Sequence, residues 1–485
     1  MIFIILLLGL VLRLINLNQS LWLDEAVQAV TSQGSLTGIF AELVGDFHPP
    51  LYHLLMWVWI HLFGSSEVVL RLPSVLFGIG TVLVVYKIGK LGKSGKLGLL
   101  GALFMATAPY HIYYSQEARM YALVTFFASL SMYWFIRLIS QISLISQIGY
   151  IFATVLMLYT DYYGSLVLLA QVIATVVTLR RRVVSLFHCC IVSLLLFLPW
   201  LPFFFLQLKT GLQAIRDLRN WANLVNVEFF KALPLTFIKF TLGRITIFDK
   251  RIYTLVGLGI LGIFGMIGGI GGMRWYRGGR REGKGPREDF YLVILLWLAV
   301  PILVAWLGSL FIPNYQPFRL LLVLPAFNLL LAMGVMSIGE KKVRALALLF
   351  ILITYHLSLI TYYTNPYFHR EDWRGVVGFI ESQKEPSVAL LPSVTSDWPW
   401  RYYSIGKVEL IGASQRVKKV EEGEIINNLT MKQFNNETMI YYIRYLVDLF
   451  DPQELINQGL TEFGYVKIKE ISFNQIPVWI YAYRD

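Results

Sequence analysis

The sequence predicts a polytopic α-helical membrane protein of about eleven spans, followed by a small C-terminal α/β or α+β domain. Of its 485 residues, 56% are hydrophobic and only 15% are charged, a composition well outside that of ordinary soluble domains. Apolar runs recur over the first 363 residues, and most can cross about 30 Å of hydrocarbon. The composition then becomes mixed, so we expect a membrane domain at 1–363 and a second domain at 364–485.

The predicted spans are the apolar runs that reach, or nearly reach, membrane length. Two of them, 1–17 and 147–161, are short and need to tilt or to pack against neighbours. The apolar stretch 50–63 is the main rival, but its short length and its two histidines, His53 and His61, favour an amphipathic segment in the membrane interface. The eleven expected spans are 1–17, 68–87, 97–115, 120–139, 147–161, 163–179, 184–206, 252–273, 290–311, 318–338 and 343–363.

Basic residues set the orientation of these spans. With the N-terminus inside, every dense cluster falls on the inner side, as the positive-inside rule requires. The same clusters account for the net charge of +12, because they adjoin an anionic membrane face, so we do not expect nucleic acid as a partner. The clusters are Lys87, Lys90, Lys93 and Lys96; Arg137; Arg180 to Arg182; the stretch 274–287; and Lys341, Lys342 and Arg344.

An odd number of spans places the C-terminal domain on the extracytoplasmic side of the cytoplasmic membrane. Within that domain, residues 372–383 have the apolar spacing of an amphipathic helix. Short runs rich in β-branched and aromatic residues predict strands. These runs are 387–391, 438–443, 465–470 and 478–483.

Two outer loops, at about 18–67 and 207–250, collect most of the charged residues on the outer face. The first loop carries Asp24 and Glu25 in LWLDEAVQAV, and Asp46 and His48 in GDFHPPLYH. Taken alone, the Asp24–Glu25 pair is explained by helix-start chemistry, since acidic residues in a first turn complement the helix dipole and can cap free N–H groups.

Further charged residues lie at outward span boundaries: Glu117 and Arg119 in YHIYYSQEARMY, and Arg319 in IPNYQPFRLLLVLP. Ionisable residues at this depth are candidates for function. Two alternatives remain open, since Glu117 and Arg119 can form an ion pair and Arg319 can extend to the lipid headgroups. An arginine there also suits a phosphate, which its planar fork of donors binds in a bidentate way. Weaker candidates of the same kind are Arg71, Lys239 and Arg244.

These motifs resemble those of a known family. The DE pair at 24–25 after a first span, the stretch 48–78 (HPPLY followed by LRLPS), YSQEARMYAL at 114–123 and DWRGVVGFI at 372–380 resemble bacterial GT-C glycosyltransferases. The resemblance is to the group related to protein O-mannosyltransferases and lipid A aminoarabinose transferases, and it covers most of residues 1–380. It implies a hexosyl- or pentosyltransferase with a polyprenyl-phosphate-linked sugar donor, an outward-facing active site and, usually, inversion at the sugar.

The resemblance also implies roles for individual residues. Asp24 corresponds to the general base, and Glu25 stands beside it as the second catalytic residue. In LYTDYYG, Asp161 stands where relatives often carry histidine, so we leave it out of the site. The implied substrate-binding residues are Asp46, His48, Glu117, Arg119 and Arg319.

The sequence leaves the cofactor and the acceptor open. Asp24, Glu25 and Asp46 are hard oxygen ligands that suit a divalent cation, but no diagnostic metal spacing is present, so we expect no required metal. The adjacent Cys189 and Cys190 form neither a disulfide framework nor a zinc site. The acceptor is a lipid, a glycan or a protein, and membrane lipids surround the spans.

Two other classes of function compete with a transferase. A transporter or flippase of a lipid-linked or small anionic substrate also needs many spans and buried charges, and typically has glycine-broken spans. The glycine run at 267–273 is the one feature of that kind, and it lies at an inner span end. A receptor built around the outer domain leaves the charges at 24, 117 and 319 without a role.

Overall fold

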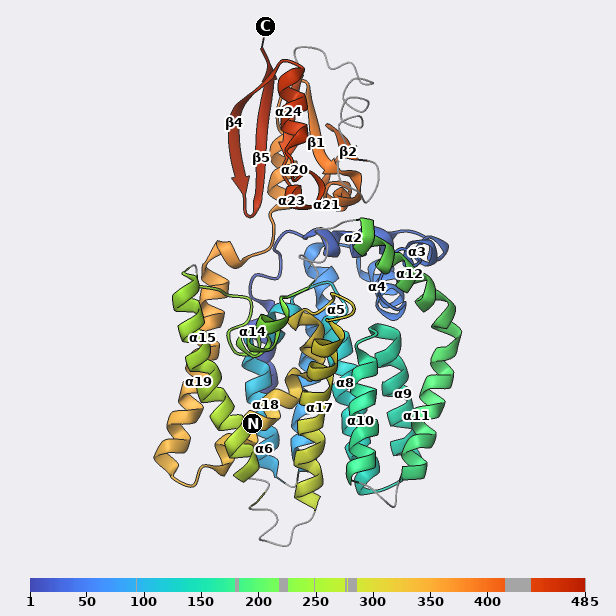
Figure 1. Ribbon diagram of the computed structural model, residues 1–485, viewed down its shortest axis with the longest axis vertical. Helices are drawn as coiled ribbons and strands as arrows, with labels where there is room; N and C mark the ends of the chain where they lie inside the picture. The colour runs from blue at the N-terminus through green and yellow to red at the C-terminus, as the bar shows by residue number, and fades with distance from the viewer. Residues whose placement is uncertain are drawn as a thin grey trace.

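The computed structural model is an upright bundle of helices with a small sheet domain at one end (Figure 1). It describes residues 1–92, 94–178, 183–217, 226–247, 249–274, 277, 286–414 and 438–484. A helical membrane domain followed by a small C-terminal sheet domain confirms the predicted fold class.

Seven helical runs among the described residues are long and apolar enough to cross a membrane. Each coincides with one of the predicted spans. They are Glu67–Leu91 (α5), Tyr121–Ser140 (α8), Leu186–Gln213 (from α11 into α12), Lys250–Arg274 (from α15 onward), Asp289–Gly308 (within α17), Pro317–Ser337 (η3 and α18) and Lys341–Thr364 (α19).

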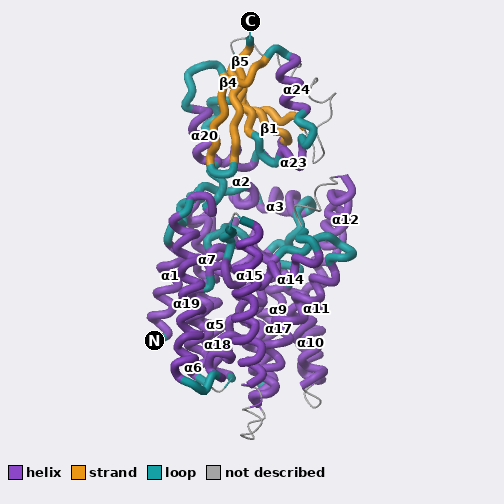
Figure 2. The backbone as a smooth tube through the Cα atoms, turned by 60° about the vertical axis from the view of Figure 1, so that its left-hand side comes forward, coloured by secondary structure: helices purple, strands orange, loops and turns teal. Residues whose placement is uncertain are grey.

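The other four predicted spans are shorter apolar helices that run beside the long ones (Figures 1 and 2). The count of eleven spans stays a prediction. These helices are α1 (Ile2–Leu14), α6 (Gly95–Thr107), α9 (Leu144–Thr160) and α10 (Gly164–Thr178). The remaining elements of the bundle are α7 (Pro109–Ser115), α11 (Val183–Phe197), η1 (Leu198–Trp200), α12 (Leu201–Asp217), α14 (Phe229–Leu242), α15 (Lys250–Gly265), the π-helical η2 (Met266–Ile270), α17 (Pro286–Gly308), η3 (Pro317–Val323) and α18 (Leu324–Ser337).

The predicted span 97–115 is interrupted in the structure. Helix α6 ends at Thr107, and Ala108 is extended, with φ −61° and ψ 113°. Pro109 explains the break, because a proline disfavours the helical conformation of the residue before it and starts a new helix well. The short helix α7 that follows carries the chain to Glu117 and Arg119 at the outer end of the bundle.

The first outer loop forms a helical layer between the bundle and the sheet domain. It contains α2 (Leu23–Gln33), α3 (Leu36–Leu43) and α4 (Leu51–Phe63), all at the same end of the bundle (Figure 1). Helix α4 is the stretch that the sequence assigns to the interface. It packs against α2 and the start of α5.

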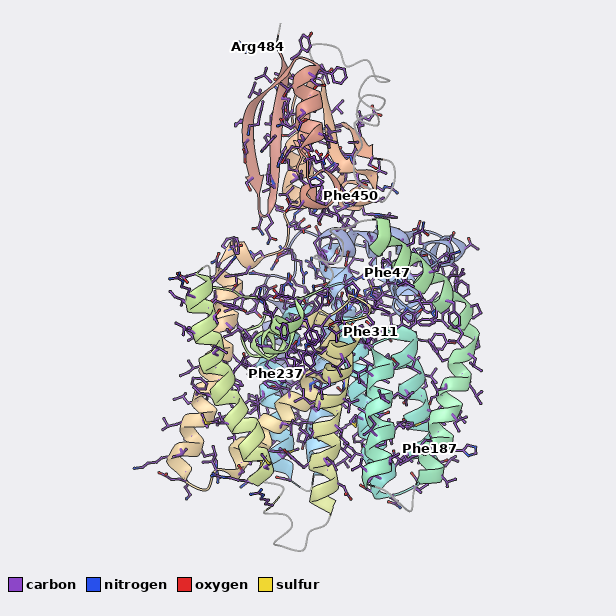
Figure 3. All side chains as sticks on the ribbon, in the orientation of Figure 1. Phe47, Phe187, Phe237, Phe311, Phe450 and Arg484 are labelled. Atoms are coloured by element: carbon purple, nitrogen blue, oxygen red, sulfur yellow. The ribbon has the colours of Figure 1, made fainter. Side chains whose placement is uncertain are left out.

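The opposite end of the bundle carries the described basic clusters. The turn between α5 and α6, the end of α8 and the start of α19 all lie at the end away from the sheet domain (Figure 1). Figure 3 labels Phe187 at this end and Phe47 in the outer layer. Lys93, Arg180 to Arg182 and most of 274–287 lie outside the described residues. The described clusters at this end are Lys87, Lys90 and Lys96; Arg137; and Lys341, Lys342 and Arg344.

The C-terminal domain is a five-stranded mixed sheet in the order β2-β1-β3-β5-β4. Strand β1 pairs in parallel with β2 and β3, while β5 pairs antiparallel with β3 and β4. The predicted helix and all four predicted strands are confirmed; β2 and the other helices are additional. The elements are α20 (Trp373–Glu381), β1 (Ser387–Ser393), η5 (Val394–Ser396), α21 (Trp398–Tyr403), β2 (Glu409–Ser414), β3 (Met439–Ile443), α23 (Val447–Phe450), α24 (Leu455–Glu462), β4 (Tyr465–Phe473) and β5 (Ile476–Tyr483).

Alternating residues of the strands build a core on each face of this sheet, as the period of two along a strand requires. Helix α20 covers one face, where Val377 packs with Tyr441 and Ile443 of β3. Helix α24 covers the other, where Ile440 and Tyr442 of the same strand are buried.

The sheet domain is docked onto the outer layer through polar contacts. Arg374 of α20 donates to Glu67 and to the Asn18 carbonyl, both at 3.1 Å. The Tyr403 hydroxyl accepts from the Leu21 N–H at 2.8 Å. Phe450, labelled in Figure 3, lies on the edge of the sheet domain nearest the bundle. The two domains therefore share one interface around the start of α2.

Candidate functional site

Glu25 and Arg71 form a buried ion pair between the first outer helix and α5. Glu25 lies in the first turn of α2, and neither side chain is more than 1% exposed. Arg71 Nε donates to Oε1 at 2.8 Å and Nη2 to Oε2 at 2.6 Å, so the guanidinium contacts both carboxylate oxygens. The Ala118 N–H adds a third hydrogen bond to Oε1 at 2.8 Å. This bidentate, charge-assisted geometry compensates two charges that would otherwise be costly to bury.

The remaining donors of Arg71 bind the chain that leaves α1. They contact the carbonyls of Leu17, Gln19 and Ser20 at 2.8, 2.6 and 3.0 Å. Burial acts to raise the pKa of Glu25, but Arg71 and Arg370 outweigh it, and the pKa is lowered. Both oxygens of Glu25 are thus occupied and its side chain has no exposed surface, while its predicted catalytic role stays a prediction.

Arg370 joins this network from the C-terminal segment. Its Nη1 lies 2.9 Å from Oε2 of Glu117, and its Nε lies 3.7 Å from Oε2 of Glu25. The guanidinium also lies 4.5 Å from the centre of the Tyr113 ring and donates to the Gln116 carbonyl at 3.3 Å. The sequence-based prediction missed Arg370. The sequence feature that could have pointed to Arg370 is the charged run HRED at 369–372, a few residues after the outward end of the last predicted span.

Asp24 is the acid of the site that keeps an accessible carboxylate. Its side chain is 37% exposed, and its nearest cation is Arg119, with Nη2 3.8 Å from Oδ2. Asp24 lies in the first turn of α2 but is not its N-cap, which is Trp22, and no hydrogen bond between the Asp24 side chain and the helix start is present among the described residues. The capping interpretation of Asp24 is therefore not supported. Glu117 and Arg119 do not pair with each other either, since their ion-pair partners are Arg370 and Asp24.

Asp46 lies between two imidazoles in the loop before α4. Its Oδ1 is 3.0 Å from Nδ1 of His48, and its Oδ2 is 2.8 Å from Nε2 of His53. Burial acts to raise the pKa of Asp46, but the two histidines outweigh it and hold the pKa well below its usual range. His53 was not among the predicted site residues, although HPPLYH places it five residues after His48.

A first cavity of about 320 Å³ lies where the C-terminal segment meets the bundle. Its charged lining residues include Glu117, Arg244, Arg370 and Glu371. Arg244 follows Gly243, whose φ of 70° lets the chain turn at the end of α14 and brings the guanidinium 5.2 Å from the Tyr113 ring. The aromatic lining is Trp22, Tyr113, Tyr114, Tyr121, Phe318, Tyr367 and Phe368.

A second cavity of about 240 Å³ lies beside α12. Its lining combines an apolar wall with polar side chains, which include His48, Asp161, Gln207, Asn314 and Arg319. Asp161, which the prediction excluded, lines this cavity, and its Oδ1 accepts from the Tyr163 N–H at 2.8 Å. The apolar wall includes Phe47, Phe204, Leu208, Leu212 and Ile312.

Adjacent residues of η3 line the two different cavities. Phe318 lines the first cavity and Arg319 the second, and the Tyr121 ring packs against Phe318 with centroids 5.3 Å apart. Tyr121 lies within electrostatic range of Asp24, Glu117, Arg119 and Arg319.

Among the described residues, two of the predicted arginines have a guanidinium nitrogen that makes no hydrogen bond. In the described structure, the Nε atoms of Arg119 and Arg319 are buried without a hydrogen-bond partner. The predicted residues are thus brought into one region at the outer end of the bundle. No set of three or more His, Cys, Asp or Glu side chains in the described residues is arranged to hold a metal ion, and metal dependence stays a prediction.

Comparison with known proteins gives a family match and a fold match. The family model described as dolichyl-phosphate-mannose-protein mannosyltransferase matches residues 47–203, which include His48, Glu117, Arg119 and Asp161. No curated protein sequence matches the chain.

Solved structures match nearly the whole chain. ArnT from Cupriavidus metallidurans bound to undecaprenyl phosphate has a TM-score of 0.58 at 13% identity, with 98% of this chain and 96% of that chain covered. The apo form of ArnT has a TM-score of 0.59 at the same identity and coverage. The oligosaccharyltransferase AglB from Archaeoglobus fulgidus, in complex with an inhibitory peptide and a dolichol-phosphate, has a TM-score of 0.52 at 11% identity, covering 91% and 69%. At these identities the likeness is one of fold.

The buried network predicts unequal effects for two nearby arginines. Replacing Arg370 with Met should lower the free energy of unfolding by about 3–5 kcal/mol, because it leaves Glu117 buried without its cation. Arg374→Met breaks a half-exposed pair with Glu67 and should cost less than about 1 kcal/mol. Thermal unfolding of the full chain in detergent compares the two variants. Equal, small shifts would contradict the assignment of Arg370 to the buried network.

Proposed function

From the GT-C glycosyltransferase fold of this chain, we propose that it is a membrane glycosyltransferase that moves a sugar from a polyprenyl-phosphate-linked donor to an acceptor hydroxyl on the outer face. The observation that carries the proposal is the whole-length fold match to a structure with bound undecaprenyl phosphate, combined with an accessible aspartate beside arginines that hold spare donors. The acceptor is a lipid, a glycan or a protein.

Asp24 is the proposed general base. It is partly exposed, carries no second ion-pair partner among the described residues, and lies within electrostatic range of Tyr121 and Glu371 of the first cavity. Glu25 is the neighbouring acid, but Arg71 and Ala118 occupy it. We therefore assign proton transfer to Asp24 alone and the orientation of its helix to Glu25.

The second cavity is the proposed place for the lipid phosphate. It pairs the Arg319 guanidinium with an apolar wall along α12, and Phe205 and Leu206 on the same helix are exposed where a membrane would surround them. An apolar chain can enter from that side, while the phosphate remains near Arg319 at the headgroup level. The planar fork of arginine suits such an anion. The aromatic walls of the first cavity offer flat faces for sugar rings.

In the proposed reaction, the acceptor oxygen attacks the anomeric carbon from the face opposite the phosphate. The new C–O bond forms as the bond between the sugar and the phosphate oxygen breaks, which inverts the anomeric centre. Asp24 takes the proton of the acceptor hydroxyl. The lipid phosphate leaves with the bonding electrons, and Arg119 and Arg319 stabilise its developing charge.

The one sequence feature that favours a transporter, the glycine run at 267–273, has a packing explanation in the structure. Gly271 packs against Gly334 of α18, and a Cβ atom there would lie 2.6 Å from the Gly334 Cα. The glycine run therefore serves close packing of η2 against α18. Small residues at helix contacts are common in membrane bundles and do not indicate transport.

Topology is the first test of the proposed location. We expect the C-terminal domain to lie outside the cytoplasmic membrane, because the described basic clusters lie at the other end of the bundle. A periplasmic phosphatase fused at Asp485 should be active. An inactive phosphatase together with a bright cytoplasmic reporter at the same position would overturn this orientation.

Asp24→Asn tests the general base. The change keeps size and hydrogen bonding but removes the proton acceptor, so the rate should fall about 10²–10⁴-fold. Yield and thermal stability should change little. The assay is radiolabel transfer from defined polyprenyl-phosphate sugars in membranes, and Glu42→Gln, on an exposed face of α3, is the matched control. Near-normal turnover of Asp24→Asn would remove Asp24 from catalysis.

Arg319→Lys tests the phosphate site. The positive charge remains, but an ammonium cannot reproduce bidentate contacts, so the KM for the donor should rise. The same substitution at Arg119 should also weaken donor use, with an added loss of kcat because Arg119 faces Asp24. Arg251→Lys, in the outer end of α15, is the control. Unchanged donor kinetics in both variants would return these arginines to a purely structural role.

A further inference from the structure

Helix α2 begins without a capping side chain of its own. Its N-cap is Trp22, and no side chain of the preceding loop accepts from its first turn. The start of α2 instead lies against the C-terminal domain: Leu23 packs against the core cluster that contains Trp373 and Tyr445, and Trp22 lines the first cavity together with Glu371, which lies 348 residues after Leu23 in the sequence. A carboxylate at this place is favourable, because the free N–H groups and the helix dipole both attract negative charge.

The Glu371 carboxylate is anchored in the core of the C-terminal domain. The Tyr445 hydroxyl donates to Oε1, and Trp373 Nε1 donates to Oε2, both at 3.1 Å. The Trp373 and Tyr445 rings pack edge to face, with centroids 4.9 Å apart, and both side chains are buried. Glu371 is thus anchored in the C-terminal domain and lines the same cavity as Trp22, the residue that precedes the turn carrying Asp24.

No cation compensates Glu371. Within the described residues, no Lys, Arg or His nitrogen lies within ion-pair distance of its carboxylate, and Asp24 is the charged group of α2 that acts on it. Burial raises the pKa of Glu371 to about 7, Asp24 adds to the rise, and the bonds from Tyr445 and Trp373 only partly oppose it. Other charged or titratable groups of the cavity wall are Glu117, Arg244, His369, Arg370 and the tyrosines 113, 114, 121 and 367.

We propose that Glu371 is a positioning residue of the reaction centre: it caps α2 from the C-terminal domain, holds Asp24 beside the first cavity, and in its ionised form makes Asp24 a better proton acceptor. This inference rests on the proposed function. A negative neighbour favours the neutral, protonated form that Asp24 reaches when it takes the acceptor proton. The kcat should therefore rise as Glu371 loses its proton.

The pH profile of kcat distinguishes this role from simple packing. In the wild type we expect kcat to rise roughly tenfold through about pH 7, the effect of about one pKa unit on the base. Glu371→Gln keeps the size and a hydrogen-bond acceptor but cannot ionise, so its kcat should stay at the low-pH level between pH 6 and 8. Glu462→Gln, exposed at the end of α24, should keep the wild-type profile.

His369 is the histidine of this cavity wall and provides a second control. His369→Gln should keep the rise in kcat. A rise that persists in Glu371→Gln, or that disappears only in His369→Gln, would overturn the proposal.

A second measurement does not depend on activity. Hydrogen exchange on the purified full chain should be faster at the amides of residues 23–26 in Glu371→Ala than in the wild type or in Glu462→Ala. Faster exchange in a chain that transfers no sugar would support the capping role while refuting the proposed function. An active wild type whose Glu371→Ala variant shows unchanged exchange would refute the capping role and leave the proposed function standing.

Discussion

The buried ion pair between Glu25 and Arg71 is the interaction on which the outer end of this molecule depends. One guanidinium binds both carboxylate oxygens and three carbonyls of the chain leaving α1, so it joins α2, α5 and the first outer loop at a single point. The Ala118 N–H connects the α7–α8 loop to the same carboxylate. Without Glu25, the buried Arg71 guanidinium would lack its counter-charge, and an uncompensated buried charge is strongly destabilising.

The same network explains how a soluble-type domain is held on a membrane bundle. Arg370 enters the bundle from the C-terminal segment and pairs with Glu117, while its Nε approaches Glu25. Glu25 and Glu117 can be buried here because each meets an arginine and because the site lies at the end of the bundle, near the headgroup level. The C-terminal domain therefore forms part of the wall of the first cavity.

The neighbouring acids Asp24 and Glu25 lie in different environments, and each environment suits a different task. Glu25 is wholly buried and bound on both oxygens, which suits it to fix a helix. Asp24, one residue earlier, points to a partly exposed position with Arg119 at 3.8 Å, which leaves it free to meet a substrate. The step of one residue on a helix turns the side chain by about 100°, and this rotation separates the buried role from the exposed one.

The sequence by itself determined the fold class and four of the five strands of the C-terminal domain, and it predicted a region for the site. Long apolar runs, alternating strand patterns and charges at span ends follow from local composition, which depends only on neighbours in the chain. Only the tertiary structure decided which acid is free and which cation each one meets. Arg370 and Glu371 lie about 345 residues from α2, so the approach of Arg370 to Glu25 and the place of Glu371 beside Trp22 in one cavity wall depend on how the two domains dock. A pairing over that separation leaves no local pattern, because it is set by packing and by the need to compensate buried charge.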